Sequence, residues 1–166
     1  MEQLKRNIIK WAADRGILSK ATPASQATKI LEECLELVIA DYNNDREEIE
    51  DACGDIYVTL VIEAHLLGLS LDVVLPTEVD TEVVINNSGS CTPRGILATA
   101  TNIFGSVTED YDSYNPTDRF IQIVYYKLVS YCAQNNVSLK DAVQGAYNII
   151  SKRTGRMENG VFVKDN

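Results

Sequence analysis

The chain has 166 residues, of which 45% are hydrophobic and 23% are charged, proportions that are typical of a globular protein and exclude a wholly disordered one. Its 24 acidic and 15 basic side chains give a net charge of −9, which argues against a broad binding face for a nucleic acid polymer, because such affinity comes largely from neutralised phosphates. A small phosphate ligand is still allowed, since it needs only a local cluster of cations or a bound metal ion. The length predicts a single domain over residues 1–166.

The sequence carries no sign of a membrane segment, a secretion signal or a zinc site. It has no run of about 18 apolar residues, and its N-terminal segment lacks the apolar stretch of a signal peptide. The four cysteines form no Cys-x-x-Cys pair, and His65 is the one histidine, which argues against structural zinc. We therefore expect a cytoplasmic protein with reduced thiols, in which Cys34 and Cys53 pack in the core. The sequence also has no P-loop, and nothing pairs His65 with a nucleophile.

The N-terminal part of the chain is predicted to form three helices. Apolar residues recur at helical spacing over residues 3–15, 24–42 and 46–67. Gly16 and Gly68 are placed to end the first and the third of these helices. A short polar turn joins the second helix to the third.

The rest of the chain begins with a less regular segment. Residues 76–92 combine β-branched residues with Asn, Ser and Gly, and we expect a loop there, with at most one short strand. Capping signals of the Thr-Pro, Asn-Pro and Ser-x-x-Asp types then predict three further helices. These helices are 93–107, 116–134 and 139–153, and a short strand or tail covers 160–164. The chain is therefore predicted to be all-α, a bundle of about five to six helices.

A weak internal repeat connects the two parts of the chain. The segment 67–73 resembles 135–141, and each follows a long apolar helix. One interpretation is a duplication, with a carboxylate-bearing unit at 24–73, a degenerate second unit at 93–143, and a C-terminal helix end and tail at 144–166. The chain would then be a fused pseudo-dimer in which only the first unit keeps its acidic side chains. The other interpretation is a chance similarity.

Acidic side chains concentrate on two consecutive predicted helices. Glu33 and Glu36 are three residues apart on one helix, Asp51 and Asp55 are four apart on the next, and the short turn between them predicts antiparallel packing. Facing carboxylates raise one another's pKa, and Mg²⁺, which prefers carboxylate oxygens and often bridges to phosphates, would relieve the repulsion. The alternative is a solvated acidic face, although these carboxylates border apolar positions. Gly54, which is costly inside a helix, indicates that the two helices approach closely there.

Three separated blocks of sequence form a recognisable set. The first is Ile-Lys-Trp-Ala-Ala-Asp-Arg-Gly at residues 9–16. The second joins Lys-Ile-Leu-Glu-Glu-Cys-Leu-Glu-Leu at 29–37 to Asp-Ala-Cys-Gly-Asp at 51–55, and the third is the segment 146–164 around Lys-Arg-Thr-Gly-Arg-Met. Together they resemble the MazG-like branch of the all-α nucleoside triphosphate pyrophosphohydrolases, and in particular its short phage-type members.

This resemblance implies a site for Mg²⁺, or for Mn²⁺, built from acidic pairs on two helices. Glu33, Glu36 and Asp55 match three of the metal-binding positions. Ala52 occupies the fourth position, where the family has an acidic residue, and the neighbouring Asp51 is the expected substitute.

The resemblance also implies which side chains act on the substrate. Glu32 is expected either to act as the base that orients the attacking water or to hold the metal-binding side chains in place without contacting the ion itself. The expected substrate-binding residues are Lys29, Asn148, Lys152, Arg153 and Trp11. Two alternatives stay open: the basic residues can instead complement the dipole of the last helix, and a single aromatic residue at helical spacing can be a core residue.

The function that the resemblance implies is Mg²⁺-dependent hydrolysis of a nucleoside triphosphate between its α- and β-phosphates. The products would be pyrophosphate and NMP or dNMP, and the enzyme would be a homo-oligomer, most simply a dimer. One alternative is a helical interaction or nucleotide-binding module that has lost the chemistry, which Ala52 favours. Another is a phosphoribosyl-ATP hydrolase, which shares this fold class.

Overall fold

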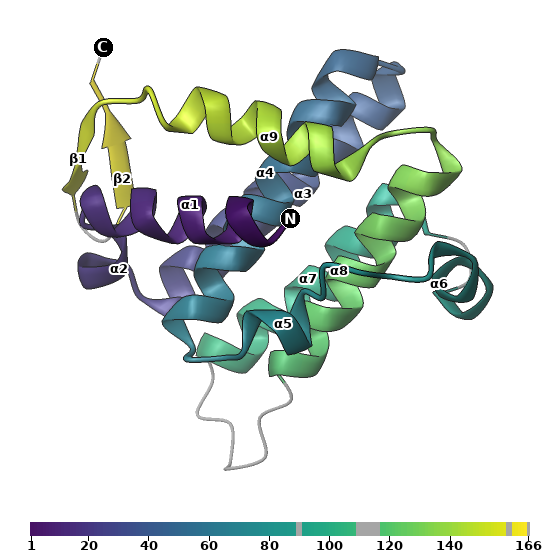
Figure 1. The fold of residues 1–166 in the computed structure, drawn as a ribbon, viewed down its shortest axis with the longest axis horizontal. Helices are drawn as coiled ribbons and strands as arrows, with labels where there is room; N and C mark the ends of the chain where they lie inside the picture. The colour runs from purple at the N-terminus through teal and green to yellow at the C-terminus, as the bar shows by residue number, and fades with distance from the viewer. Residues whose placement is uncertain (89–90, 109–116, 159–160, 166) are drawn as a thin grey trace.

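The computed structural model describes residues 1–88, 91–108, 117–158 and 161–165. These residues form a helical bundle with a β-hairpin at one edge (Figure 1). The helices are α1 (Glu2–Asp14), α2 (Ile17–Lys20), α3 (Pro23–Asn43), α4 (Arg46–Leu66), α5 (Leu71–Val74), α6 (Thr81–Ser88), α7 (Pro93–Thr108), α8 (Thr117–Gln134) and α9 (Leu139–Ile150). The hairpin strands, β1 (Gly155–Glu158) and β2 (Val161–Lys164), pair antiparallel. The predicted helical-bundle class is confirmed, and β1 is an addition to it.

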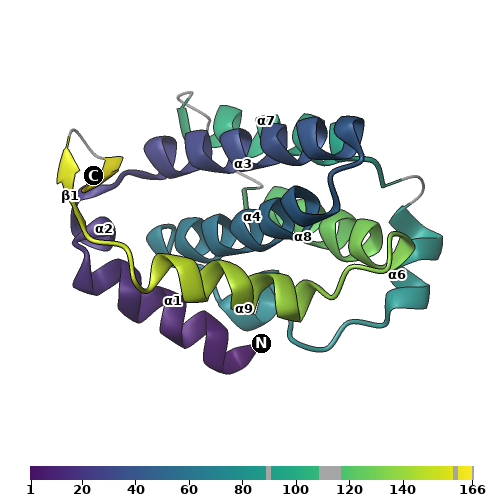
Figure 2. The ribbon, with the colours of Figure 1, turned by 90° about the horizontal axis from the view of Figure 1, so that it is seen from above.

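The helices stack in three layers (Figure 2). α3 and α7 lie side by side in one layer, α4 and α8 form the middle layer, and α1 and α9 cover the other face of α4. α4 is therefore central to the core, and every residue from Ile56 to Ala64 is buried. One of these is Glu63, whose carboxylate oxygens have no hydrogen-bond partner among the described residues. Burial raises the pKa of Glu63 to about 8.

Local sequence determines where α3 and α4 begin. The Thr22 hydroxyl accepts a hydrogen bond from the Ser25 backbone N–H at 3.1 Å, and the Ser25 hydroxyl accepts one from the Thr22 N–H at 3.0 Å, which is a reciprocal capping box. Asp45 caps α4 by accepting a hydrogen bond from the Glu48 N–H at 3.2 Å. Asn44, with a φ of 54°, supplies the left-handed residue at the reversal. The two helices therefore run antiparallel, as predicted.

Several smaller predictions also agree with the structure. Gly16 and Gly68 follow the ends of α1 and α4 with φ values of 73° and 68°. All four cysteines are free and buried, which confirms the packing role predicted for Cys34 and Cys53. No helix in the described part of the chain is long and apolar enough to cross a membrane.

The close approach at Gly54 is with α9 and not with α3. A Cβ atom added to Gly54 would lie 2.4 Å from the carbonyl oxygen of Ala142 and 3.0 Å from the Cβ of Ala146. The prediction that Gly54 lets the two acidic helices approach is therefore wrong, because a glycine in a sequence does not say which neighbour lies across from it. Its lack of a side chain instead lets α9 cross α4 at short range.

Two segments after residue 80 also differ in structure from the prediction. Thr81–Ser88 is helix α6 and not a loop or strand, because Asp80 accepts hydrogen bonds from two backbone N–H groups of its first turn and the helix packs on α8. Packing here outweighs the weak helix preference of β-branched residues. α9 ends at Ile150 and not near residue 153, and Gly155 begins β1. The predicted cap at 115–116 lies outside the described residues.

α7 and α8 form a second pair of helices that packs on the first pair. α7 contacts α3 along its length, and α8 contacts α4. This arrangement is compatible with the internal duplication, and the division into units at 24–73 and 93–143 stays a prediction.

Candidate active site

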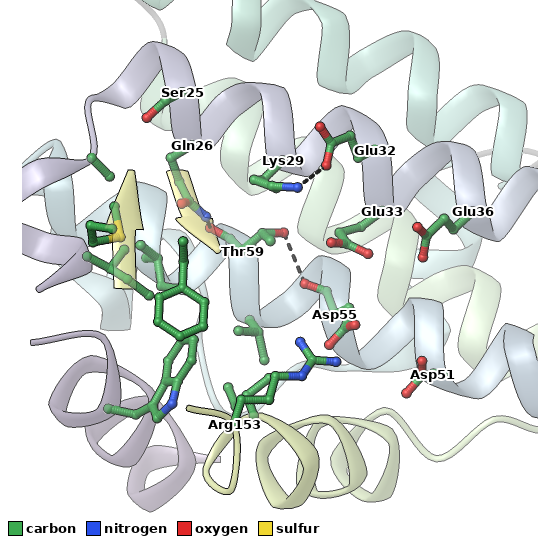
Figure 3. A pocket seen from close by; sticks show the side chains of 18 residues that line it. Ser25, Gln26, Lys29, Glu32, Glu33, Glu36, Asp51, Asp55, Thr59 and Arg153 are labelled. Carbon is green, nitrogen blue, oxygen red and sulfur yellow. Dashed lines mark hydrogen bonds and ion pairs between the residues drawn. The ribbon is translucent and has the colours of Figure 1, made fainter. Parts of the chain in front are cut away.

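A cavity of about 370 Å³ lies along the antiparallel pair α3 and α4 (Figure 3). Its wall is completed by side chains from α1, α2, the hairpin and the segment at the end of α9. Gln26 links the two long helices, because its side-chain amide donates a hydrogen bond to the Thr59 carbonyl oxygen at 3.2 Å. The cavity therefore brings both ends of the chain to the helices that carry the acidic residues.

One end of the cavity is acidic. Its wall carries Glu32, Glu33 and Glu36 from α3 and Asp51 and Asp55 from α4, and Figure 3 shows Glu33 and Glu36 on the α3 side facing Asp55 and Asp51 on the α4 side. Burial and the charges of Asp55 and Glu36 raise the pKa of Glu33 to about 8. Near neutral pH this carboxyl group mostly keeps its proton, which a bound cation would displace.

Two cationic side chains line the same part of the cavity. The Lys29 ammonium forms an ion pair with Glu32 of the next helical turn. Arg153, which follows α9, points its guanidinium group toward Asp55 (Figure 3). The structure does not bring Asn148 and Lys152 to this wall: both are exposed, and Asn148 accepts a hydrogen bond from Gln144 of α9.

The acidic residues have the right chemistry for a hard divalent cation, because Mg²⁺ and Mn²⁺ prefer carboxylate oxygens. Asp51 lies on the cavity wall, whereas Ala52 is buried in the core, so Asp51 is the side chain that presents a fourth carboxylate. Within the described ranges, no three Asp, Glu, His or Cys side chains are grouped so that they could hold a metal ion. Mutual repulsion of the carboxylates favours such a separation.

The other end of the cavity is apolar and aromatic. The rings of Trp11 and Phe162 meet edge to face, with centroids 6.0 Å apart. Ile17 and Met157 complete this end, and Met157 lies beside the chain reversal at Gly16. The indole Nε1 of Trp11 is buried and has no hydrogen-bond partner among the described residues.

Sequence reasoning missed several residues of this wall. Gln26 and Thr59 carry a signal that was available: Gln26 lies on the same helical face as Lys29 and Glu33, and Thr59 is four residues beyond Asp55. Met157 and Phe162 carry no such signal, because nothing in a strand near the end of a chain indicates which helices the strand will cover. Tyr57, the aromatic residue of α4, does not line the cavity and is fully buried against Tyr125.

Comparisons with known proteins agree with the family resemblance. Residues 1–80, just under half of the chain, match the family described as phosphoribosyl-ATP pyrophosphohydrolase, PRA-PH. A relative is the uncharacterized 18.2 kDa protein in the rep-hol intergenic region of Haemophilus phage HP1 (strain HP1c1), which is 39% identical over 64 residues. The matched segment covers 39% of this chain and 39% of the phage protein. No solved structure matches the chain.

Proposed function

Because residues 1–80 carry a domain of the phosphoribosyl-ATP pyrophosphohydrolase family, we propose that this chain is a Mg²⁺-dependent nucleoside triphosphate pyrophosphohydrolase. The reaction would cleave the bond between the α- and β-phosphates and release pyrophosphate and NMP or dNMP. The observation that carries the proposal is the cavity wall to which two antiparallel helices contribute five carboxylates, one of which, Glu33, has its pKa raised by burial and by the charges of Asp55 and Glu36.

Glu33, Glu36, Asp51 and Asp55 are the residues that would hold Mg²⁺, or Mn²⁺ in its place. When bound, the ion would neutralise phosphate oxygens and polarise the phosphorus centre. Its binding would require Glu33 to release its proton, so the affinity for metal should rise with pH up to about pH 8.

The other polar side chains would act on the water and on the leaving group. Glu32 would accept a proton from the attacking water, and its ion pair with Lys29 holds its carboxylate at the cavity wall. Arg153 would neutralise the charge that develops on the departing pyrophosphate, because a fixed cation beside a leaving group stabilises the transition state. In the metal-free protein this guanidinium points toward Asp55 (Figure 3).

A second candidate is a nucleotide-binding module that keeps the fold but does not catalyse hydrolysis. Ala52 in place of an acidic residue favours it, and so does the lack of a ready metal-holding group among the described residues. The two candidates differ in what Mg²⁺ does: an intact metal site raises the melting temperature by mass action on the folded state.

The experiment that tests the proposal is a panel of ribo- and deoxyribonucleoside triphosphates with Mg²⁺, scored for pyrophosphate release, together with thermal unfolding with and without Mg²⁺. The matched pair of variants is Glu36→Gln, on the cavity wall, and Glu47→Gln, on an exposed position of α4 outside the wall. We expect Glu36→Gln to lose pyrophosphate release and Glu47→Gln to keep it. Equal activity in the two variants, or no release by the wild type, would contradict the enzyme assignment.

The predicted homodimer also stays a proposal. An exposed apolar stripe on α3 supports it, since Leu35, Ile39 and Tyr42 follow one another at helical spacing and are 48%, 52% and 78% exposed. Sedimentation equilibrium of the wild type and of a Leu35→Glu/Ile39→Glu variant tests it: a dimer that the double variant dissociates is the expected result, and a wild-type monomer is the contrary one.

A further inference from the structure

We propose that Gln26 is a specificity-determining residue of the cavity, and that its side-chain amide oxygen accepts a hydrogen bond from a hydroxyl group on the sugar of the bound nucleotide. Neither the metal site nor the leaving group gives this side chain a role. The inference rests on the proposed function, because the triphosphate is taken to lie at the acidic end of the cavity.

The hydrogen bond between Gln26 and Thr59 determines how the Gln26 amide is oriented. Gln26 is only 6% exposed, and its Nε2 atom donates to the Thr59 carbonyl oxygen at 3.2 Å. A backbone carbonyl can only accept a hydrogen bond, so the amide atom that meets it has to be the nitrogen. The amide oxygen is therefore the terminal atom that is left for another partner.

The Gln26 amide oxygen is an acceptor that is open to the cavity. It accepts no hydrogen bond within the described ranges of the chain. It is also not one of the described polar atoms that are both without a partner and closed off from solvent. Because Gln26 lines the cavity, its oxygen meets solvent there. An acceptor held in place on a nearly buried side chain favours a ligand that brings a hydrogen to it.

The neighbouring polar side chains of the wall are engaged elsewhere. The Thr59 hydroxyl bonds within its own helix, to the carbonyl oxygens of Asp55 at 3.0 Å and of Ile56 at 2.8 Å. The Lys29 ammonium, one turn beyond Gln26 on α3, pairs with Glu32. The hydrogen that satisfies the Gln26 oxygen therefore comes from water or from a bound ligand.

The position of Gln26 along the cavity selects the sugar as the donor. Thr59, which lies opposite Gln26, is four residues beyond Asp55, about 6 Å along α4, and Glu33 is seven residues beyond Gln26, about 10 Å along α3. Gln26 thus lies next to the carboxylates, on the side toward Ser25 (Figure 3). Ionised phosphates offer only acceptor oxygens. In a nucleotide the sugar adjoins the α-phosphate, so a sugar hydroxyl is the first donor that reaches this level.

The binding test uses the wild-type protein with Mg²⁺ and four α,β-methylene nucleoside triphosphates, which resist hydrolysis at the bond in question. The four share the base that the wild type binds best and carry ribose, 2′-deoxyribose, 3′-deoxyribose or 2′,3′-dideoxyribose. We expect the dideoxy analogue to bind roughly 5- to 150-fold more weakly than the ribose analogue, because the Gln26 oxygen loses its partner. One monodeoxy analogue should share this loss and so identify the hydroxyl group. Equal affinity for all four analogues overturns the inference.

Two variants assign the effect to Gln26. Gln26→Met keeps the length of the side chain but removes the acceptor, so the ratio of ribose to dideoxyribose affinity should fall to about twofold or less. The ratio is the readout because the variant also loses the bond to Thr59, which can weaken the binding of every analogue alike. Thr59→Val is the control: it removes a hydroxyl group from the same stretch of wall, and it should keep the wild-type ratio. A Gln26→Met variant that keeps the ratio, or a Thr59→Val variant that loses it, overturns the assignment.

A last comparison separates the sugar from the base. If Gln26→Met changes the ratio between the adenosine and purine riboside analogues, which differ in a base amino group, the oxygen contacts the base and the inference is wrong. These affinity ratios do not depend on pyrophosphate release. A wild type that shows the sugar ratio but releases no pyrophosphate would contradict the proposed function and leave this inference standing, whereas a wild type that binds no triphosphate would contradict both.

Discussion

Glu63 makes the stability of this protein depend on pH in a direction that can be worked out. Its side chain is 0% exposed in the middle of α4, and burial raises its pKa from an ordinary 4.5 to about 8. Between these two values the folded protein keeps a proton that the unfolded chain has lost. The unfolded state then binds fewer protons than the folded state, so the free energy of unfolding falls as pH rises from about 4.5 to about 8, and it is level outside that window.

The size of the effect follows from the same two values. Each pKa unit corresponds to about 1.4 kcal/mol, so Glu63 alone accounts for a loss of roughly 5 kcal/mol across the window. This is comparable to the whole stability of a marginal domain, about 5–15 kcal/mol. Glu63→Gln has nearly the same shape and no charge. It should match the wild type near pH 4.5 and exceed it by several kcal/mol at pH 8.

Urea unfolding at intervals from pH 4.5 to pH 8.5 measures this difference. Glu33 has the same sign of dependence, because its pKa is also raised to about 8, but saturating Mg²⁺ should cancel the contribution of Glu33 and leave that of Glu63. The exposed Glu47→Gln variant should keep the wild-type slope. If Glu63→Gln loses stability with pH as steeply as the wild type does, Glu63 is not buried without a partner as described, and the reasoning fails.

Three further predictions concern the site and its support. Asp55→Asn should abolish Mg²⁺-dependent hydrolysis. It should also make the metal-free protein more stable at pH 8, because it removes the neighbouring charge that raises the pKa of Glu33. Assays of pyrophosphate release and of urea unfolding check these two effects. Arg153→Ala should weaken triphosphate binding more than monophosphate binding in calorimetric titrations, whereas Lys152→Ala, on an exposed position off the wall, should change neither by more than about twofold; equal losses for the two ligands would remove Arg153 from the phosphate site. Gly54→Ala should lower the free energy of unfolding by about 1–3 kcal/mol, because its Cβ would lie 2.4 Å from a backbone carbonyl of α9; a variant as stable as the wild type in chemical unfolding would mean that α9 does not cross so closely.

The parts of this fold that could be predicted from the sequence are those that local signals determine. The capping residue Thr22 and the reversal at Asn44 are local, and they fix where α3 begins and ends. The spacing of Glu33, Glu36 and Asp55 then predicts the acidic wall, because side chains three or four positions apart share one face of a helix.

The parts that could not be predicted depend on contacts between distant segments. Gly54 signals a close approach but does not name α9 as the neighbour. The β-branched segment at 81–88 becomes a helix because it is capped by Asp80 and packs on α8, and propensity alone points the other way. The contact of Phe162 with Trp11 joins the two ends of the sequence, and no local pattern encodes that pairing.

The contact between Trp11 and Phe162 also means that the complete cavity needs both ends of the chain. Trp11 and Phe162 are separated by 151 positions in the sequence, and bringing such distant residues together carries a loop-closure cost in entropy. The segment matched by the family ends at residue 80, before α7 and α9, which cover α3 and α4. A chain cut there would expose the apolar faces that these helices cover and would lack every wall residue from Ile150 to Phe162. All the acidic residues of the wall therefore lie within the matched segment, whereas Met157 and Phe162 at the aromatic end lie outside it.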